Sequence, residues 1–291
     1  MKIVTFKKDD SDKNYRIGAF VSDAEIVDLT SLCTNENLSA GEILNCFDLE
    51  NDFLEKAETA IKNDDLPKLK RAEITICAPV PRPGKIICIG LNYRNHAEES
   101  GMAIPTSPIV FSKFSSCAIG ANEAISLPEK SEQVDYEAEL AFIVGRRAKN
   151  VSAADAMNYV FGYTNFNDVS ARDFQFADGQ WTRGKSCETF APMGEFVATK
   201  DEINDPHNLQ IQFRLNGETL QNSNTGELIF KIPELVEFLS ASITLEPGDV
   251  VATGTPPGVG FARKPPIFLK DGDIAEVEIE GLGILTNPVK R

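Results

Sequence analysis

Alternation of hydrophobic and polar residues over much of the chain predicts β-strands. In "LQIQFRLNGETL" the apolar residues fall on every second position: Leu209, Ile211, Phe213 and Leu215. This run ends at Asn216-Gly217, a pair that favours a two-residue hairpin turn. Other strand-like runs are "KIICIG", "PIVFSKF", "VDYEAELAF", "DVVATG" and "DIAEVEIEGLGILTNPV". Because these strands follow one another without regular intervening helices, we expect a β-rich, mostly antiparallel fold of the α+β class.

Helical spacing is confined to a few segments. In "LENDFLEKAETAIKN" apolar residues recur every three or four positions, which predicts a helix. "SAADAMNYV" opens with a capping-box pattern of Ser152 and Asp155, and "IPELVEFLSAS" carries Pro233 where a first helical turn tolerates proline. The proline-rich "APVPRPGK" reads as a stiff extended connection. We therefore expect a small amino-terminal domain over residues 1–75 and a larger domain over residues 76–291.

The net charge and the cysteine content indicate which partners the protein binds and in which compartment it lies. The 291 residues carry a formal net charge of −15, whereas nucleic acids and anionic membranes attract basic surfaces, so we expect neither as a partner. The start "MKIVTFKKDDSDKNYR" has no apolar signal-peptide core. Six cysteines without CxxC spacing indicate reduced thiols, and we expect a cytoplasmic protein. With only two histidines, any metal site would use oxygen ligands.

Acidic residues interrupt one of the predicted strands. On a strand, Asp135, Glu137 and Glu139 share one face, where unpaired like charges repel unless water or a cation neutralises them. A solvated face is the ordinary explanation, and a metal site is the alternative. Downstream, "GYTNFNDVSARDFQ" places Asp168 near a strand end. There it either caps a turn and pairs with Arg172, or supplies a third oxygen ligand to Mg²⁺ or Mn²⁺.

Three loop segments offer further polar groups. If "GLNYRNHAEESG" turns helical, His96 and Glu99 lie on one face and form a general-base dyad; otherwise His96 is a capped loop residue. "GQWTRGKS" matches the phosphate-loop pattern, but it lacks the preceding apolar strand and the following long helix. We therefore do not expect a nucleoside triphosphatase. Lys185 in that segment is then a surface lysine or an active-site cation. In "VATGTPPGVG", Thr255 lies either in a plain turn or beside a bound carboxylate.

In combination these motifs resemble the fumarylacetoacetate hydrolase family over residues 80–290. The resemblance rests on "IGLNYRNHAEE", "PIVFSKF", "VDYEAELAFIVG", "GYTNFNDVSARDFQ", "RGKSCETFAPMG", "DPHNLQIQFRLNGE" and "LEPGDVVATGTPPGVG". It implies a mixed β-roll or β-sandwich core with a small amino-terminal α+β domain, assembled as a homodimer. It also implies a divalent cation, Mg²⁺ or Mn²⁺ and sometimes Ca²⁺, held by Glu137, Glu139 and Asp168.

The resemblance also implies catalytic and substrate-binding residues. The catalytic set is His96, Glu99 and Lys185, and the substrate-contacting set is Arg172, Gln175 and Thr255. The first activity we expect is metal-dependent hydrolysis of a carbon–carbon bond in a 2,4-dioxo acid, which yields pyruvate or a related 2-oxo acid plus a carboxylic acid.

Other functions use the same parts. Decarboxylation or tautomerisation of oxaloacetate, or isomerisation of a 2-oxo diacid, needs the cation and a base but no hydrolytic water. A non-enzymatic module that binds a small anion is a further alternative. Specificity would rest on the loops "EESGMAIPTS" and "FQFADGQWT", either of which is a candidate lid.

Overall fold

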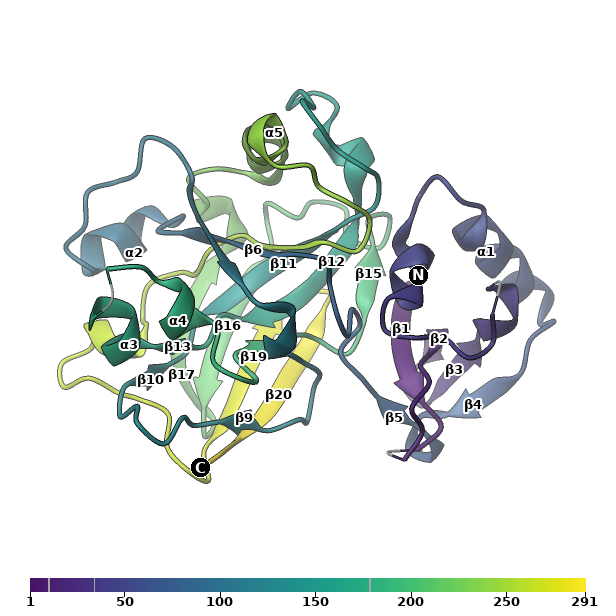
Figure 1. The fold of residues 1–291 in the computed structure, drawn as a ribbon, viewed down its shortest axis with the longest axis horizontal. Helices are drawn as coiled ribbons and strands as arrows, with labels where there is room; N and C mark the ends of the chain where they lie inside the picture. Colours follow the sequence, from purple (N-terminus) through teal and green to yellow (C-terminus); the bar gives the residue numbers. More distant parts are fainter. Residues whose placement is uncertain (10, 34, 178) are drawn as a thin grey trace.

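Two β-sheets lie against each other in the larger part of the molecule, and a smaller amino-terminal unit flanks them (Figure 1). The structure is a computed structural model and describes residues 1–291 apart from 10, 34 and 178. Strands β11 and β12 of the first sheet contact β16, β19 and β20 of the second. The main hydrophobic core fills the space between the sheets, so the expected β-rich sandwich-type fold is confirmed.

The first sheet runs from the amino-terminal unit into the larger part of the molecule. Its strands, in spatial order, are β4 (Lys68–Lys70), β3 (Glu25–Asp28), β2 (Arg16–Ser22), β1 (Lys2–Lys7), β15 (Val197–Thr199), β12 (Val160–Asn167), β11 (Ala138–Val144), β18 (Val250–Ala252), β6 (Ile86–Gly90) and β7 (Ile109–Lys113), with β5 (Thr75–Ile76) paired to β1. These pairs are antiparallel except β18 with β6. Because β1 pairs with β15, the sheet is continuous across the predicted domain boundary. The division at residues 75 and 76 stays a prediction.

The second sheet contains the predicted hairpin. In spatial order it comprises β17 (Glu218–Asn224), β16 (Gln210–Leu215), β19 (Ile274–Ile279), β20 (Gly283–Lys290) and β9 (Ile125–Ser126). Asn216 and Gly217 have φ angles of 52° and 82°, the left-handed conformation that a tight hairpin turn requires. Two short pairs complete the strands: β10 (Val134–Asp135) with β13 (Ser170–Ala171), and β14 (Ala191–Pro192) with β8 (Ala118–Ile119).

The helices lie around the sheets. The α-helices are α1 (Phe53–Asn63), α2 (Arg94–Glu99), α3 (Arg172–Ala177), α4 (Thr182–Lys185) and α5 (Ile232–Ser242). The 3₁₀-helices are η1 (Thr30–Leu32), η2 (Glu42–Phe47), η3 (Arg71–Glu73), η4 (Ser115–Cys117), η5 (Ala156–Tyr159), η6 (Thr225–Glu227) and η7 (Gly260–Ala262). The helices predicted at α1 and α5 are confirmed, with Pro233 in the first turn of α5. The "SAADAMNYV" segment forms only the short η5. Within the described residues, no helix has the length and apolar character needed to cross a membrane.

The two central strands are buried on both faces. Every residue of β11 and β12 is buried, because the second sheet covers one face and the amino-terminal unit contributes to the core on the other. The predicted strand "VDYEAELAF" is interrupted: β10 ends at Asp135 and β11 begins at Ala138. This break lies at the start of β11, opposite the end of β12, and the acidic residues gather there.

Candidate active site

The pairing of β11 with β12 brings three acidic residues together. The register sets Ala138 opposite Asn167, and the Asp168 amide donates a hydrogen bond to the Glu137 carbonyl over 2.9 Å. As a result, ligand oxygens of Glu137, Glu139 and Asp168 all lie within 4.8 Å of one another. All three side chains are buried, so their charges need nearby cations. The arrangement can hold a metal ion.

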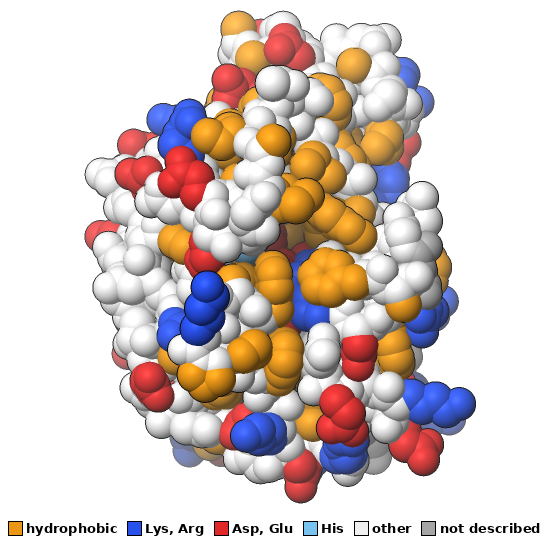
Figure 2. Space-filling view, turned by 90° about the vertical axis from the view of Figure 1, so that its left-hand side faces the viewer, with side chains coloured by type: hydrophobic (Ala, Val, Ile, Leu, Met, Phe, Trp, Pro, Cys, Tyr) orange, Lys and Arg blue, Asp and Glu red, His pale blue; other side chains and the backbone are white. Residues whose placement is uncertain are grey.

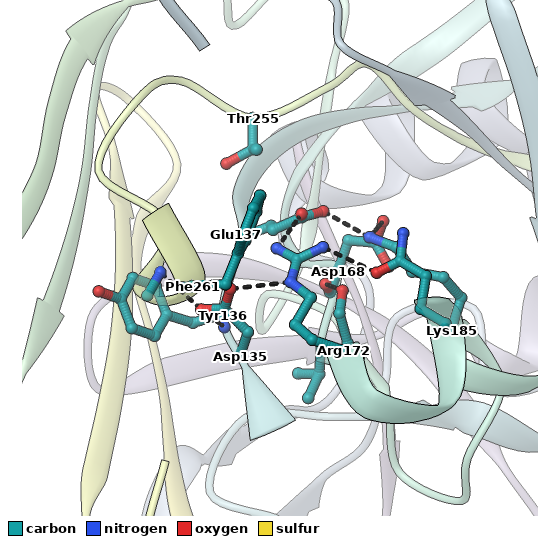
Figure 3. Close-up of polar contacts among 12 residues, drawn as sticks. Asp135, Tyr136, Glu137, Asp168, Arg172, Lys185, Thr255 and Phe261 are labelled. Carbon is teal, nitrogen blue, oxygen red and sulfur yellow. Dashed lines mark hydrogen bonds and ion pairs between the residues drawn. The ribbon is translucent and has the colours of Figure 1, made fainter. Parts of the chain in front are cut away.

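Two lysines approach Asp168 from opposite sides. Lys185, at the end of α4, donates to Glu137 over 2.6 Å and to Asp168 Oδ2 over 2.8 Å (Figure 3). Lys113, at the end of β7, is fully buried and donates to Asp168 Oδ1 and to the Val169 carbonyl, the latter over 2.9 Å. Lys113 was not among the site residues predicted from the sequence. The available signal was a lysine in the mostly apolar strand "PIVFSKF".

Arg172 is the third buried cation of the cluster. It opens α3 and donates to Asp135 over 2.9 Å, to Glu137 over 2.6 Å and to Gln175 over 2.9 Å (Figure 3). Burial would by itself raise the pKa of Glu137, but the charges of Lys185 and Arg172 outweigh it and hold that pKa below its ordinary value. Glu137 is therefore an anion at neutral pH.

Glu139 has no such positive charges bonded to it among the described residues. Its side chain accepts the Gly254 amide hydrogen over 2.8 Å, and among the described residues no lysine or arginine donates to it. Burial and the charges of Asp168 and Glu137 raise the pKa of Glu139 well above its ordinary value. A buried carboxylate short of positive charge beside two further oxygen donors fits a hard divalent cation such as Mg²⁺ or Mn²⁺.

The expectation that Asp135 is a solvated acid is wrong. Its side chain is fully buried and accepts hydrogen bonds from the amides of Gly260 and Phe261 as well as from Arg172. The Phe261 ring lies 4.4 Å from the Arg172 guanidinium carbon. Strand alternation predicts the face on which the Asp135 side chain lies. It does not predict that the loop with Gly260 and Phe261 covers this side chain, because that loop is more than a hundred residues away in the sequence.

His96 and Glu99 lie on one helical turn of α2 but are not hydrogen-bonded to each other among the described contacts. His96 is buried, its Nδ1 has no hydrogen-bond partner, and burial lowers its pKa to about 4. Glu99 instead accepts the Gly258 amide hydrogen over 2.7 Å. In this structure His96 is therefore a neutral imidazole without an orienting carboxylate. The catalytic roles of both residues stay predictions.

A cavity of about 170 Å³ joins these groups to the surface. Its polar lining includes His96, Glu137, Glu139, Arg172, Gln175, Lys185 and Thr255. Its apolar lining includes Met102, Phe176, Trp181 and Phe261. Figure 2 shows a hollow rimmed by hydrophobic side chains, with charged groups deeper inside. The predicted site residues, apart from Glu99 and Asp168, thus surround one small, charged space.

The two loops expected to set specificity both reach this cavity. Met102 comes from "EESGMAIPTS", and Phe176 and Trp181 come from "FQFADGQWT", of which Asp178 lies outside the described residues. The Trp181 ring packs over Gly90, where a Cβ atom would lie only 2.6 Å from the ring. The segment that mimics a phosphate loop forms the four-residue α4, and its lysine binds carboxylates. This supports our rejection of a nucleotide-binding loop.

Thr255 is tied to the strand that carries Glu139. Its hydroxyl donates to the Ala138 carbonyl over 2.9 Å and accepts from Gln221 over 2.8 Å. Gln221, on β17, also accepts the Ala138 amide hydrogen over 2.9 Å. The sequence analysis missed Gln221, which links the second sheet to the start of β11 and fixes the cavity wall.

Comparisons with known proteins show which family this chain resembles. Residues 85–290 match the C-terminal domain of fumarylacetoacetate hydrolase. The Rattus norvegicus protein named oxaloacetate tautomerase Fahd2a, mitochondrial, is 49% identical over 244 residues, which are 81% of this chain and 78% of the relative. The Dictyostelium discoideum protein named fumarylacetoacetate hydrolase domain-containing protein 2 homolog is 45% identical over 302 residues, 100% of this chain and 97% of the relative.

A solved structure shows a similar fold with ligands bound. The crystal structure of maleylpyruvate hydrolase from Sphingobium sp. SYK-6, in complex with manganese(II) ion and pyruvate, is 29% identical with a TM-score of 0.81. The match covers 100% of this chain and 99% of that chain.

The expectation of a cytoplasmic location is contradicted by the relatives. The names of those from rat, frog, cattle and human place them in mitochondria. The absence of an apolar secretory signal and the presence of reduced thiols do not separate cytoplasm from mitochondria, because mitochondrial targeting segments are amphipathic. The family match spans most of the sequence, and the chain belongs to the fumarylacetoacetate hydrolase family of enzymes.

Proposed function

We propose that the protein is a metal-dependent oxaloacetate tautomerase, which interconverts the enol and keto forms of this 2-oxo diacid. The observation that carries the proposal is the state of His96, a neutral imidazole that faces the cavity while Glu99 is bonded to the Gly258 amide. A proton shuttle needs such a base, whereas hydrolysis also needs a positioned water. The tautomerase name of the rat relative supports the same choice.

The cavity suits a small anionic substrate. Its buried wall contains the ammonium group of Lys185 and the guanidinium group of Arg172, both bonded to Glu137, and its volume of about 170 Å³ matches a short acid. We propose that Glu137, Glu139 and Asp168 hold Mg²⁺ or Mn²⁺, with Ca²⁺ as an alternative. Such a cation, when bound, polarises the carboxylate and keto oxygens of a 2-oxo acid and favours its enolate.

The residues of the chain then supply the proton transfers. His96 takes a proton from the carbon next to the keto group, and the electron pair of that C–H bond moves onto the keto oxygen. The Lys185 ammonium group stabilises the negative charge that develops on this oxygen. A proton from solvent then binds the oxygen and completes the enol, while protonated His96 releases its proton to solvent. In the reverse direction the oxygen loses its proton and His96 delivers a proton to carbon.

A second candidate function is hydrolysis of a 2,4-dioxo acid. It is favoured by the likeness to a maleylpyruvate hydrolase and by the presence of both His96 and Glu99 on α2. This reaction requires the two side chains to come together around a water molecule. Decarboxylation of oxaloacetate passes through the same enolate as tautomerisation, so it is grouped with the tautomerase proposal.

The test measures the decay of the ultraviolet absorbance of enol-oxaloacetate with purified protein and Mg²⁺ or Mn²⁺. Faster decay than in buffer, abolished by a chelator, supports tautomerisation. We expect His96→Gln to lower the rate by about 10²–10⁴-fold while calorimetric Mn²⁺ binding persists. His207→Gln is the matched control, because His207 caps α5 by accepting the Ile232 amide hydrogen and lies outside the cavity lining. Unaccelerated enol decay together with pyruvate release from acetylpyruvate would assign the hydrolase instead.

Two further proposals concern the metal and the assembly. Glu137→Gln should abolish Mn²⁺ binding in a calorimeter, and unchanged binding would refute the ligand set.

A homodimer is proposed from the family resemblance, and sedimentation velocity would test it.

A further inference from the structure

Two cysteines of the amino-terminal unit lie in contact. The Sγ atoms of Cys33, which follows η1, and Cys46, within η2, are 3.5 Å apart. Cys33 is partly exposed, whereas Cys46 is buried. Neither residue takes part in the site described above. This pair therefore combines an accessible sulfur with a protected one at contact distance.

We propose that Cys33 and Cys46 form a reversible disulfide when the protein meets a hydroperoxide, which makes them a modification site separate from the catalytic cavity. A disulfide brings two sulfurs to about 2.05 Å, so the pair must close by roughly 1.5 Å. Cys33 lies at the carboxyl end of η1 and Cys46 in a 3₁₀-helix, so no β-ladder holds either residue in place.

The chemical asymmetry of the pair sets the order of reaction. The hydrogen bond with Cys46 lowers the pKa of Cys33, and the same hydrogen bond together with burial raises the pKa of Cys46. Accessible thiols with lowered pKa are the ones that react first with peroxide, and a neighbouring thiol then resolves the product. Cys33 is thus the attacking sulfur and Cys46 the resolving sulfur.

The reaction balances with hydrogen peroxide as the oxidant. The Cys33 thiolate attacks one peroxide oxygen, the O–O bond breaks, and the departing hydroxide takes up a proton to give Cys33 sulfenic acid and water. The Cys46 sulfur then attacks the Cys33 sulfur, the S–OH bond breaks, and the departing hydroxide takes the Cys46 thiol proton to give a second water. In total, two thiols and one peroxide give one disulfide and two waters; the sulfurs lose two electrons that the peroxide gains.

The link would restrain the segment that docks the amino-terminal unit. Next to Cys46, the Phe47 ring packs on Phe161 of β12 at a centroid distance of 5.0 Å. The Leu49 amide donates to the Gly145 carbonyl, just beyond β11, over 2.7 Å. A disulfide from η1 to η2 therefore restrains the segment that contacts β11 and β12, the two strands that lead to the acidic cluster.

The test uses the whole 291-residue chain with hydrogen peroxide as the probe. We expect the thiols titrated under denaturing conditions to fall from six to four, with one Cys33–Cys46 peptide found by mass spectrometry and six thiols restored by dithiothreitol. Cys46→Ser should give a Cys33 sulfenic acid that a dimedone probe traps, without the link. Cys187→Ser, a change at a separate half-buried cysteine, should form the link as the native chain does.

Three results would overturn the proposal. They are retention of all six thiols at peroxide doses that oxidise a free thiol reagent, a mixture of pairings that includes other cysteines, and a Cys33→Ser protein that still loses the Cys46 thiol at the native rate. Circular dichroism of each variant confirms that it is folded before oxidation, so a misfolded variant is not read as a result.

Discussion

At the scale of single residues, the candidate site is dominated by charged side chains that are buried. Asp168 has no exposed surface and takes one lysine on each oxygen, Lys113 on Oδ1 and Lys185 on Oδ2. Removing one partner of a buried ion pair leaves a charge that water cannot reach, which costs more than the pair itself contributes. The contribution of Lys113 can therefore be measured without any substrate.

We expect Lys113→Met to lower the free energy of unfolding of the metal-free protein by about 3–5 kcal/mol. The substitution keeps the apolar stem but leaves Asp168 Oδ1 and the Val169 carbonyl without their donor. Urea unfolding followed by circular dichroism measures the change. Lys62→Met, on the exposed face of α1, is the matched control and should change stability by less than about 0.5 kcal/mol. Equal effects of the two substitutions would contradict this role of Lys113.

His96 gives a prediction on pH. Its pKa in the folded protein, about 4, is below the ordinary 6.5, so between these values the unfolded chain binds the proton more readily. The stability that neutral His96 contributes is therefore fully present above pH 6.5, falls progressively below pH 6.5, and is gone once pH has fallen through 4. From pH 7 to pH 5 the native chain should lose about 2 kcal/mol more than His96→Gln. Urea unfolding at both pH values measures this, and identical losses in the two proteins would refute it.

At the scale of elements, the wall of the cavity depends on a close fit between β6 and the segment before α4. Gly90 ends β6, and the Trp181 ring occupies the space that a side chain there would need. The ring also meets Phe111 of β7 edge-on, with centroids 5.3 Å apart. Because the chain has one tryptophan, its fluorescence reports on this wall alone.

We expect Gly90→Ala to displace Trp181 and to weaken ligand binding. A Cβ atom at position 90 would lie 2.6 Å from the ring, so the indole must move and its edge-on contact with Phe111 is disturbed. The emission should shift to longer wavelength, and the Kd for pyruvate in the presence of Mn²⁺ should rise about tenfold, or ~1.4 kcal/mol. Gly41→Ala has room for its methyl group and is the control. An unchanged emission spectrum in Gly90→Ala would show that the wall is not set by this contact.

Elements with local signals were predictable, and contacts between distant segments were not. The hairpin at Asn216-Gly217 and helices α1 and α5 follow from spacing and turn chemistry. The grouping of Glu137, Glu139 and Asp168 was one of two alternatives that the residues left open, the family resemblance implied it, and the strand register accounts for it. Lys113 and the burial of Asp135 depend on segments far apart in sequence, which periodicity does not place.

At the scale of the whole molecule, the amino-terminal unit and the larger part share a core. One hydrophobic cluster contains Ile3, Ile17 and Phe47 from the unit together with Ile143, Phe161 and Val250 from the central strands. The net charge of −15 does not fall within this core, which is made of hydrophobic residues. A shared core predicts that the two parts unfold together.

Phe47→Ala tests this cooperativity. The Phe47 ring has no exposed surface and packs edge-on against Phe161, so its removal should cost about 3–5 kcal/mol. Trp181 reports unfolding of the larger part, while far-ultraviolet circular dichroism reports the whole chain. We expect both urea transitions of the variant to shift together to lower concentration, since loss of the unit uncovers Ile143 and Phe161 on strands that hold the site. Phe238→Ala, at a residue of α5 that is 41% exposed, is the control and should shift both transitions far less. A Trp181 transition that stays at its native midpoint while the dichroism transition splits would mean that the amino-terminal unit folds independently.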